Sequence, residues 1–177
     1  KNIKAGTLGI AAGFSFFSTK VMTTGEGGMV TTNDKHLWKK MWSYKDHGKN
    51  FEAVYKKSSS PGFRWLHDSF GSNFRMTEVQ AAIGRIQLRK LSAWIKTRTI
   101  NAKLLKQVCD SYPKLLSTPV ISKHSIHSYY RFYTYIKSEG LEDGWNRDKI
   151  IEEINKLGVP CFSGSCSEIY LESAFDK

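Results

Sequence analysis

Lys20 is the residue whose type and surroundings point most directly to chemistry. It ends the apolar run FSFFSTK (residues 14–20), and the glycine-rich stretch GEGG begins at Gly25. An ammonium group at the end of a buried strand is costly unless it has a partner or a function. A desolvated lysine amine is also nucleophilic toward aldehydes. The pattern therefore predicts Lys20 as a Schiff-base lysine, although most lysines in any sequence are surface charge.

Polar residues before and after Lys20 have the chemistry to hold a phosphate. Ser15 lies five residues before Lys20, and its hydroxyl can donate to a phosphate oxygen or simply alternate on a strand. Asn73 and Arg75 precede Thr77, where a helix is expected to begin. Polar side chains beside a helix N-terminus suit an anion, or they only fix the entry to the helix. An amine with phosphate donors makes pyridoxal phosphate (PLP) the candidate cofactor.

Two short strands and a helix are expected to position Lys20. Residues 11–17 and 27–32 have the composition of buried strands. The glycines at 25, 27 and 28 fit a tight turn, and their spacing matches neither a dinucleotide-binding loop nor a Walker loop. Asn33 and Asp34 are expected to cap a helix over 34–46 with one apolar face, which His47 and Gly48 end.

The later elements change in character near residue 110. Residues 49–72 are aromatic-rich, with a flexible loop at 58–62. Thr77 and Gln80 fit a capping box for a helix that runs to about Val108, with a break near Ser92. A strand over 128–137 and a helix over 146–157, stopped by Gly158, should follow. The predicted fold class is α/β, with a domain over residues 1–109 and a smaller one over 110–177.

Composition narrows the function classes. The 177 residues are 40% hydrophobic and 13% aromatic, which favours a packed core, and the formal net charge is +11. The basic residues are dispersed and no nucleic-acid motif accompanies them, so a phosphate-bearing small molecule is the better-supported anion. No apolar run suits a membrane span, and the N-terminus has neither a signal-peptide pattern nor an initiator Met. We therefore expect a chain that starts within a longer protein.

Three cysteines do not form a convincing framework. Cys109, Cys161 and Cys166 are odd in number and lack repeated spacing, which argues against disulfides. Cys161-x4-Cys166 has no second ligand pair for zinc. The expectation is a reducing, cytoplasmic environment and no metal site.

Several motifs taken together resemble a known family. FSFFSTK-x4-GEGGMVTTND, then KDHG, then GSNFRMTEVQAAIGRIQLRKL are similar to the DegT-type PLP-dependent sugar-nucleotide aminotransferases. The resemblance is dense over residues 5–105 and looser to 177. It implies the later part of a fold-type-I large domain, with a mostly parallel sheet and helices, followed by a small α+β domain.

The resemblance also implies roles for residues. Lys20 would form the Schiff base with PLP and act as general base and acid, and Ser15 would bind the phosphate. Asn73 would reach the phosphate in the partner's site of a homodimer, and His47 would lie near the substrate. The reaction would move an amino group, usually from glutamate, to a nucleotide-linked keto-sugar for polysaccharide or glycoconjugate biosynthesis.

The chain departs from the family in length. Members are about twice as long, so the phosphate-binding helix N-terminus, the ring stacked on the pyridine and the carboxylate at its nitrogen are expected before residue 1. This chain alone is accordingly expected to be inactive. Asp34, Asp46 and Asp68 follow Lys20 and do not replace that carboxylate by position, and Ser18 stands where a proline is often found. A non-catalytic module of the same fold and, less well supported, a nucleic-acid-binding domain remain alternatives.

Overall fold

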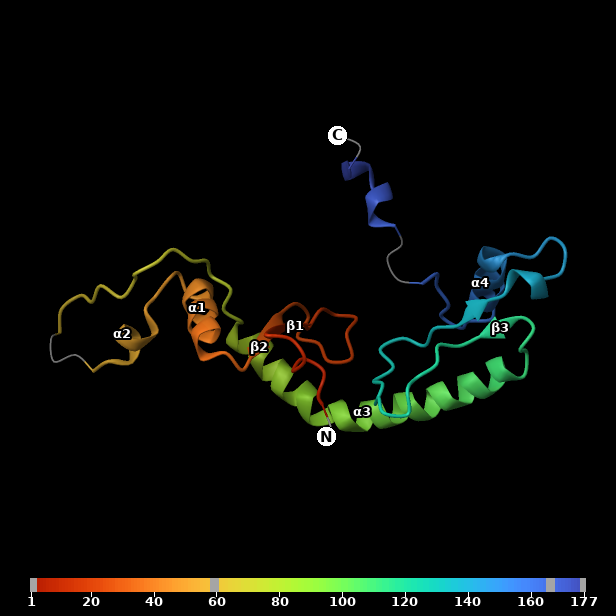
Figure 1. The fold of residues 1–177 in the computed structure, drawn as a ribbon, viewed down its shortest axis with the longest axis horizontal. Coiled ribbons are helices and arrows are strands. Elements are labelled where there is room, and N and C mark those ends of the chain that lie inside the picture. Colours follow the sequence, from red (N-terminus) through yellow and green to blue (C-terminus); the bar gives the residue numbers. More distant parts are fainter. Residues whose placement is uncertain (1–2, 58–60, 165–167, 176–177) are drawn as a thin grey trace. The chain divides into compact units, whose positions relative to one another are not determined.

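The chain divides into two compact units in a computed structural model that describes residues 3–57, 61–164 and 168–175. The contacts separate Lys1–Trp94 from Ile95–Lys177, and the division falls within one long helix (Figure 1). The domain boundary expected after residue 109 stays a prediction. The expected loop residues 58–60 and Cys166 lie outside the described residues.

The N-terminal unit begins with a β-hairpin. Strands β1 (Ala11–Ser15) and β2 (Gly28–Thr32) pair antiparallel, from Ala11 opposite Thr32 to Ser15 opposite Gly28. Both predicted strands are therefore present, and the first ends two residues earlier than expected. The pairing is antiparallel because the connection folds straight back, whereas parallel strands need a longer crossover, usually helical. The described strands thus do not include the parallel part of the expected sheet.

Helix α1 (Lys35–Lys45) starts where the sequence predicted. Asp34 Oδ1 accepts hydrogen bonds from the backbone N–H groups of Leu37 (3.0 Å) and His36 (2.8 Å). The hydrogen bond from Leu37, together with that from His36, holds the pKa of the Asp34 carboxyl below its ordinary value. The N-cap is therefore a charged, acceptor-only group that satisfies two backbone donors.

The aromatic-rich residues 49–72 contain a short helix that the sequence did not predict. Helix α2 (Phe51–Tyr55) is capped by Asn50, whose side-chain oxygen accepts from Ala53 N–H at 2.8 Å. The Phe51 ring meets Trp38 at 4.8 Å and Trp42 at 5.0 Å between centroids. The apolar face expected on α1 is thus used to dock α2, because edge-to-face rings stabilise such a contact.

Helix α3 (Glu78–Asp110) opens with the predicted capping box. Thr77 N–H donates to Gln80 Oε1 at 3.0 Å, and Gln80 N–H donates to Thr77 Oγ1 at 3.3 Å. The expected break near Ser92 is wrong, since the helix is continuous to Asp110. A single serine costs a helix interior only a few tenths of a kcal/mol, about 0.5, which is too little to interrupt a helix of this length.

The C-terminal unit pairs two very short strands. β3 (Leu116–Ser117) and β4 (Tyr135–Ile136) are antiparallel. The expected strand over 128–137 is wrong before residue 135, because Tyr129 has φ of 48°, which an extended strand does not allow. Arg98 Nη1 donates to the carbonyls of Tyr129 (3.1 Å) and Tyr130 (3.3 Å) and holds this bend.

The remaining elements follow β4. Helix α4 (Arg147–Lys156) matches the predicted helix, with Asn146 as N-cap and Gly158 at φ of 78° after its end. Among the described residues of this unit, single-turn 3-10 helices also lie at Ser138–Gly140, Ile169–Leu171 and Ser173–Phe175.

Few side chains of the described residues are buried. Phe16, Ala102 and Cys109 are the buried apolar residues, and Thr24 and Asp46 are the buried polar ones. Many large apolar side chains are exposed, among them Phe63, Trp65 and Phe70. Another part of a longer protein or another chain would have to cover these side chains to remove them from water.

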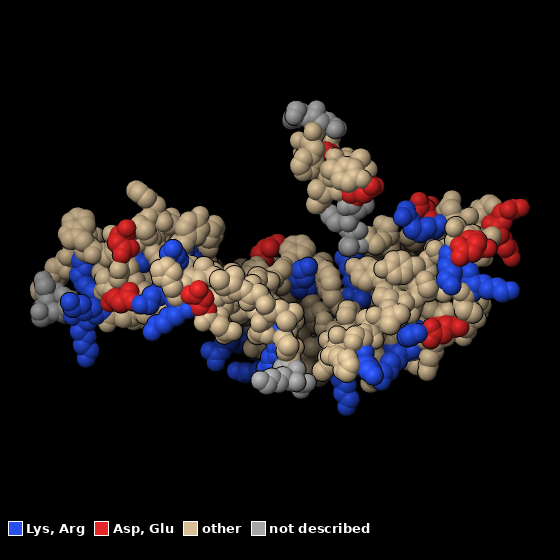
Figure 2. Space-filling view, in the orientation of Figure 1, with Lys and Arg blue, Asp and Glu red and all other residues tan. Residues whose placement is uncertain are grey.

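Figure 2 shows lysines and arginines scattered among acidic side chains on the visible face, in keeping with dispersed basic residues. Among the described residues, no helix combines the length and apolar character that crossing a bilayer requires. The same residues contain no cluster of three or more potential metal ligands.

Candidate PLP site

The connection between β1 and β2, residues 16–27, holds Lys20 and is called the Lys20 loop. Lys20 is half-buried, and its backbone N–H donates to the Phe17 carbonyl at 2.9 Å. Phe16 closes the loop: its N–H donates to Gly27 O at 2.8 Å, and its carbonyl accepts from Thr24 N–H at 3.0 Å. Only Phe16 is buried, whereas Phe17 is 43% exposed. The core position expected for the whole run therefore holds at Phe16 alone.

The Lys20 loop is fastened to the start of α3. The buried Thr24 hydroxyl donates to the Glu26 carbonyl at 2.6 Å, and Gln80 Nε2 donates to the same carbonyl at 2.9 Å. A Cβ on Gly27 would lie 2.6 Å from Thr24 Oγ1, and one on Gly84 would lie 2.9 Å from Thr24 Cγ2. Glycine at 27 leaves room for Thr24 within the loop, and glycine at 84 lets Thr24 lie close to the helix. Gln80, a capping residue of the helix, also anchors the loop through Glu26.

Ser15 ends β1 on the border of this loop. It is exposed, and its hydroxyl oxygen accepts from Phe17 N–H at 3.3 Å. That contact uses the oxygen as acceptor and leaves the hydroxyl hydrogen to be donated. The structure thus places one amine and one hydroxyl donor on adjoining parts of the same hairpin.

The backbone at Asp46 and His47 pairs with the segment that holds Asn73, also within the N-terminal unit. Residues 66–75, called the Asn73 segment, run beside the end of α1: Asp46 bridges Asn73 in antiparallel fashion, and His47 N–H donates to Ser72 O at 3.1 Å. His47 is exposed with φ of 61°. Non-glycine residues in this conformation are uncommon and concentrate at functional sites.

Gly48 makes that approach possible. Its φ is 84°, and a Cβ there would lie 1.8 Å from the Ser69 carbonyl oxygen. No side chain fits at that distance, so glycine is required. The KDHG motif therefore has a structural role beside the Asn73 segment, in addition to the role expected for His47.

Asp46 makes contacts beside Asn73 that sequence reasoning did not predict. Its carboxylate lies 3.1 Å from Lys49 Nζ and 3.7 Å from Arg75 Nε. Burial pushes the pKa of Asp46 upward, but the Lys49 hydrogen bond and the charges of Lys49 and Arg75 outweigh it, so the pKa lies below its ordinary value. The available signal was a carboxylate at a helix end with a lysine three residues later.

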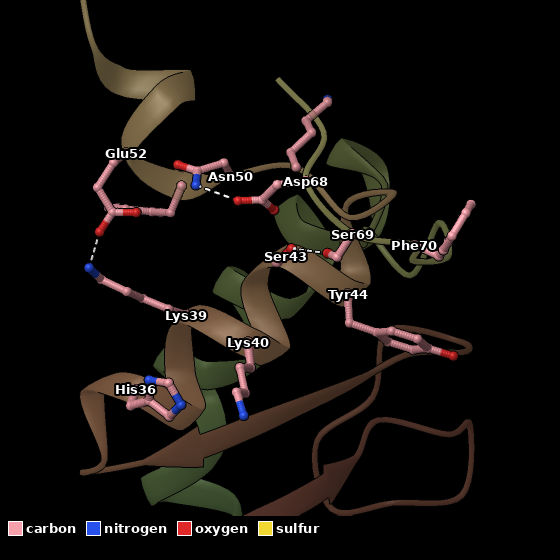
Figure 3. Close-up of a pocket in the computed structure, with 12 residues that line it drawn as sticks. His36, Lys39, Lys40, Ser43, Tyr44, Asn50, Glu52, Asp68, Ser69 and Phe70 are labelled. Carbon is pink, nitrogen blue, oxygen red and sulfur yellow. Dashed lines mark hydrogen bonds and ion pairs between the residues drawn. The ribbon is translucent and has the colours of Figure 1, made fainter. Parts of the chain in front are cut away.

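An open cavity lies elsewhere in this unit. It has a volume of about 480 Å³ and lies between α1, α2 and residues 68–70 (Figure 3). Figure 3 shows Lys39 paired with Glu52, and Asn50 pointing to Asp68. Asn50 Nδ2 donates to Asp68 Oδ2 at 2.6 Å. The lining residues do not include Ser15, Lys20, His47 or Asn73; they are His36, Lys39, Lys40, Ser43, Tyr44, Lys49, Asn50, Phe51, Glu52, Asp68, Ser69 and Phe70.

A family model matches almost the whole chain. Residues 1–165 match the DegT/DnrJ/EryC1/StrS aminotransferase family. The chain belongs to this family. The resemblance seen in the Lys20, KDHG and Asn73 motifs is confirmed, and so is the fold class, because the similar solved structures are PLP-dependent aminotransferase folds.

Comparison with individual relatives shows what fraction of their length this chain covers. It is 41% identical over 166 residues to the UDP-4-amino-4,6-dideoxy-N-acetyl-beta-L-altrosamine transaminase of Helicobacter pylori, covering 90% of the chain and 39% of the relative. The X-ray structure of an aminotransferase from Psychrobacter cryohalolentis superposes with a TM-score of 0.93 at 53% identity, covering 98% and 46%. The chain therefore spans under half the length of these relatives.

A further structure concerns the cofactor. The GDP-4-keto-6-deoxy-D-mannose-3-dehydratase of E. coli, with bound hydrated PLP, superposes with a TM-score of 0.72 at 27% identity, covering 91% of this chain and 42% of that one. Pyridoxal phosphate is the cofactor of the family. The groups on the Lys20 hairpin fit it: a primary amine suits its aldehyde, and the Ser15 hydroxyl hydrogen suits its phosphate.

Proposed function

We propose that this chain supplies the Schiff-base lysine, Lys20, of an enzyme that moves an amino group from an amino acid to a nucleotide-linked keto-sugar. The observation that supports this most is the fixed Lys20 loop in a member of a PLP-dependent aminotransferase family. The relatives act, by their names, as a transaminase on a UDP-sugar and a dehydratase on a GDP-keto-sugar. A nucleotide-linked sugar is the substrate class common to both.

Lys20 Nζ has two tasks in this proposal. It would hold the cofactor at its aldehyde carbon, and as general base and acid it would take up and return a proton at Nζ. PLP supplies an electron sink when bound. The hydrogen bonds of Phe16 and Thr24 fix the backbone around Lys20, which limits the reorganisation needed to place its amine.

The other predicted residues complete the proposal. Ser15 donates to the phosphate from the same hairpin, Asn73 donates to the phosphate in the partner's site, and His47 lies near the sugar. A homodimer with shared sites is part of the proposal, and it would bury exposed apolar side chains of the N-terminal unit. Glutamate is the proposed amino donor, polysaccharide or glycoconjugate biosynthesis the proposed purpose, and the cytoplasm the proposed location.

The complete gene product provides the test. With PLP bound, the visible absorption of the cofactor and release of 2-oxoglutarate from glutamate are measured for the wild type and Lys20→Ala. We expect Lys20→Ala to lose the absorption and at least about 10³-fold in rate. The matched control is Lys106→Ala, which removes an exposed lysine paired with Asp110 on α3. An unchanged cofactor spectrum in Lys20→Ala would exclude the assignment.

A further inference from the structure

We propose that Arg75 and Asp46 are positioning residues that turn the Asn73 amide so that its nitrogen, and not its oxygen, faces a bound phosphate. This inference rests on the proposed function, in which Asn73 contacts the PLP phosphate. It assigns a role to Asp46, which no motif singled out, and a positioning role to Arg75, which the sequence placed only beside a helix N-terminus that suits an anion.

The first step is the orientation of the Asn73 amide. Asn73 Oδ1 accepts from Arg75 Nε–H at 3.2 Å and lies 3.4 Å from Arg75 backbone N–H. Both groups of Arg75 are donors that cannot accept. A reversed amide would press N–H against N–H, so the oxygen must face Arg75. The Asn73 NH₂ group, with two donors, is therefore directed to the other side.

The second step is what the exposed NH₂ group can bind. A phosphate offers only acceptors at neutral pH when it is fully ionised, and hydrogen bonds between a donor and an ionised acceptor are the stronger kind. An amide free to rotate would present its oxygen part of the time and repel the phosphate. Fixing the amide through Arg75 removes that unfavourable state before the phosphate arrives.

The third step is what holds Arg75. Its side chain is half exposed, so it would be mobile without a partner, and its Nε lies 3.7 Å from Asp46 Oδ1. The Asp46 side chain is 12% exposed and fixed by Lys49 Nζ at 3.1 Å. Asp46 also bridges Asn73 through the backbone. The Asp46 carboxylate thus holds the Arg75 guanidinium, and the guanidinium holds the amide of Asn73, the proposed phosphate donor.

The experiment compares PLP with pyridoxal, which lacks the phosphate, in the complete gene product. The measured quantity is the affinity for PLP divided by the affinity for pyridoxal. A variant that merely loosens the fold weakens both affinities and leaves this ratio unchanged. We expect Asn73→Ala to lower the ratio about 10- to 100-fold, the range for a hydrogen bond to a charged group. We expect Arg75→Leu and Asp46→Asn each to lower it about 3- to 10-fold, as indirect supports do.

A double variant separates positioning from direct contact. If Arg75 acts through Asn73, adding Arg75→Leu to Asn73→Ala changes the ratio less than about twofold further. A multiplicative loss in the double variant would mean that Arg75 touches the phosphate itself, which overturns the inference. An unchanged ratio in Arg75→Leu or Asp46→Asn overturns it as well.

Two further variants keep the result interpretable. Arg75→Lys preserves the charge but not the Nε–H, and we expect the same loss of ratio; full retention would show that charge alone matters and contradict the inference. Arg147→Leu, which removes an exposed arginine paired with Asp148, is the control and should leave the ratio unchanged. Wild-type binding that depends on Lys20 would stand whatever the Arg75 result, so the two proposals fail separately.

Discussion

The Lys20 loop and the Asn73 segment are positioned by different forces. The Lys20 loop is fixed by uncharged hydrogen bonds from backbone, Thr24 and Gln80. The Asn73 segment is fixed by the close approach at Gly48 and by the charges of Asp46 and Arg75. Uncharged contacts change little with pH or salt, whereas charged ones respond to both. The position of the Lys20 loop, which is proposed to do the chemistry, should therefore change little with pH or salt. The position of the Asn73 segment, which is proposed to bind the phosphate, should depend on both.

The largest expected effect comes from a matched pair of glycines. Gly48 and Gly25 have φ of 84° and 79°, but a Cβ on Gly25 would meet nothing within 4 Å. We expect Gly48→Ala to cost about 2–4 kcal/mol, from backbone strain plus overlap with Ser69 O, and Gly25→Ala about 1 kcal/mol. Urea unfolding of both variants measures the difference. Equal losses would show that the close approach at Gly48 is not needed.

The next effect is the pH response of Asp46. We expect Asp46→Asn to cost about 1–2 kcal/mol at neutral pH, because Lys49 and Arg75 lose their partner. The folded pKa of Asp46 is depressed, so its contribution is present above the unfolded value, about 3.9, and is lost as pH falls through the folded one. Unfolding free energies of wild type and variant should therefore converge below about pH 4. A gap that stays constant to pH 3 would contradict the charged role.

A smaller, pH-insensitive effect is expected in the Lys20 loop. Thr24→Val removes the buried hydroxyl that donates to Glu26 O, while Gln80 still donates to that carbonyl. The cost should be about 1 kcal/mol and should be the same at pH 5 and pH 8 and in 0.1 M and 1 M salt. Denaturant unfolding under the four conditions checks this. A loss that varied with salt would remove the contrast between the two regions.

The smallest effect concerns the helix start that follows the Asn73 segment. Thr77→Ala removes half of the capping box, and Gln80 keeps its contact with Glu26. We expect a loss of about 0.5–1 kcal/mol in the free energy of unfolding. Thr77→Ser, which retains the hydroxyl, should restore most of it. A Thr77→Ser variant as unstable as Thr77→Ala would show that the hydroxyl is not the cap.

Local signals in the sequence predicted more than long-range ones. Asp34, the Thr77 capping box and Gly158 were found because caps and stops depend on residues within one turn. The strand expected over 128–137 failed because Arg98, about thirty positions earlier, holds Tyr129 in a bend. The break expected near Ser92 failed because one weak residue cannot interrupt a long helix.

The same distinction applies to the site. Lys20 and Ser15 could be named as candidates because strand and turn signals surround them, and their roles stay predictions. That His47 lies beside Asn73 depends on a pairing between Asp46 and Asn73 that spacing does not reveal. Asp46 was set aside as a carboxylate in the wrong place for the cofactor nitrogen, and its contacts with Lys49 and Arg75 appear only in the folded chain.

The central claim is that Lys20 bonds to the cofactor. Borohydride reduction of the PLP-loaded complete gene product, followed by proteolysis and mass spectrometry, locates the lysine that bears a pyridoxyl group. The account predicts the label on Lys20 in the wild type and its absence in Lys20→Arg. A stoichiometric label on another lysine, with Lys20 unmodified, would contradict the account.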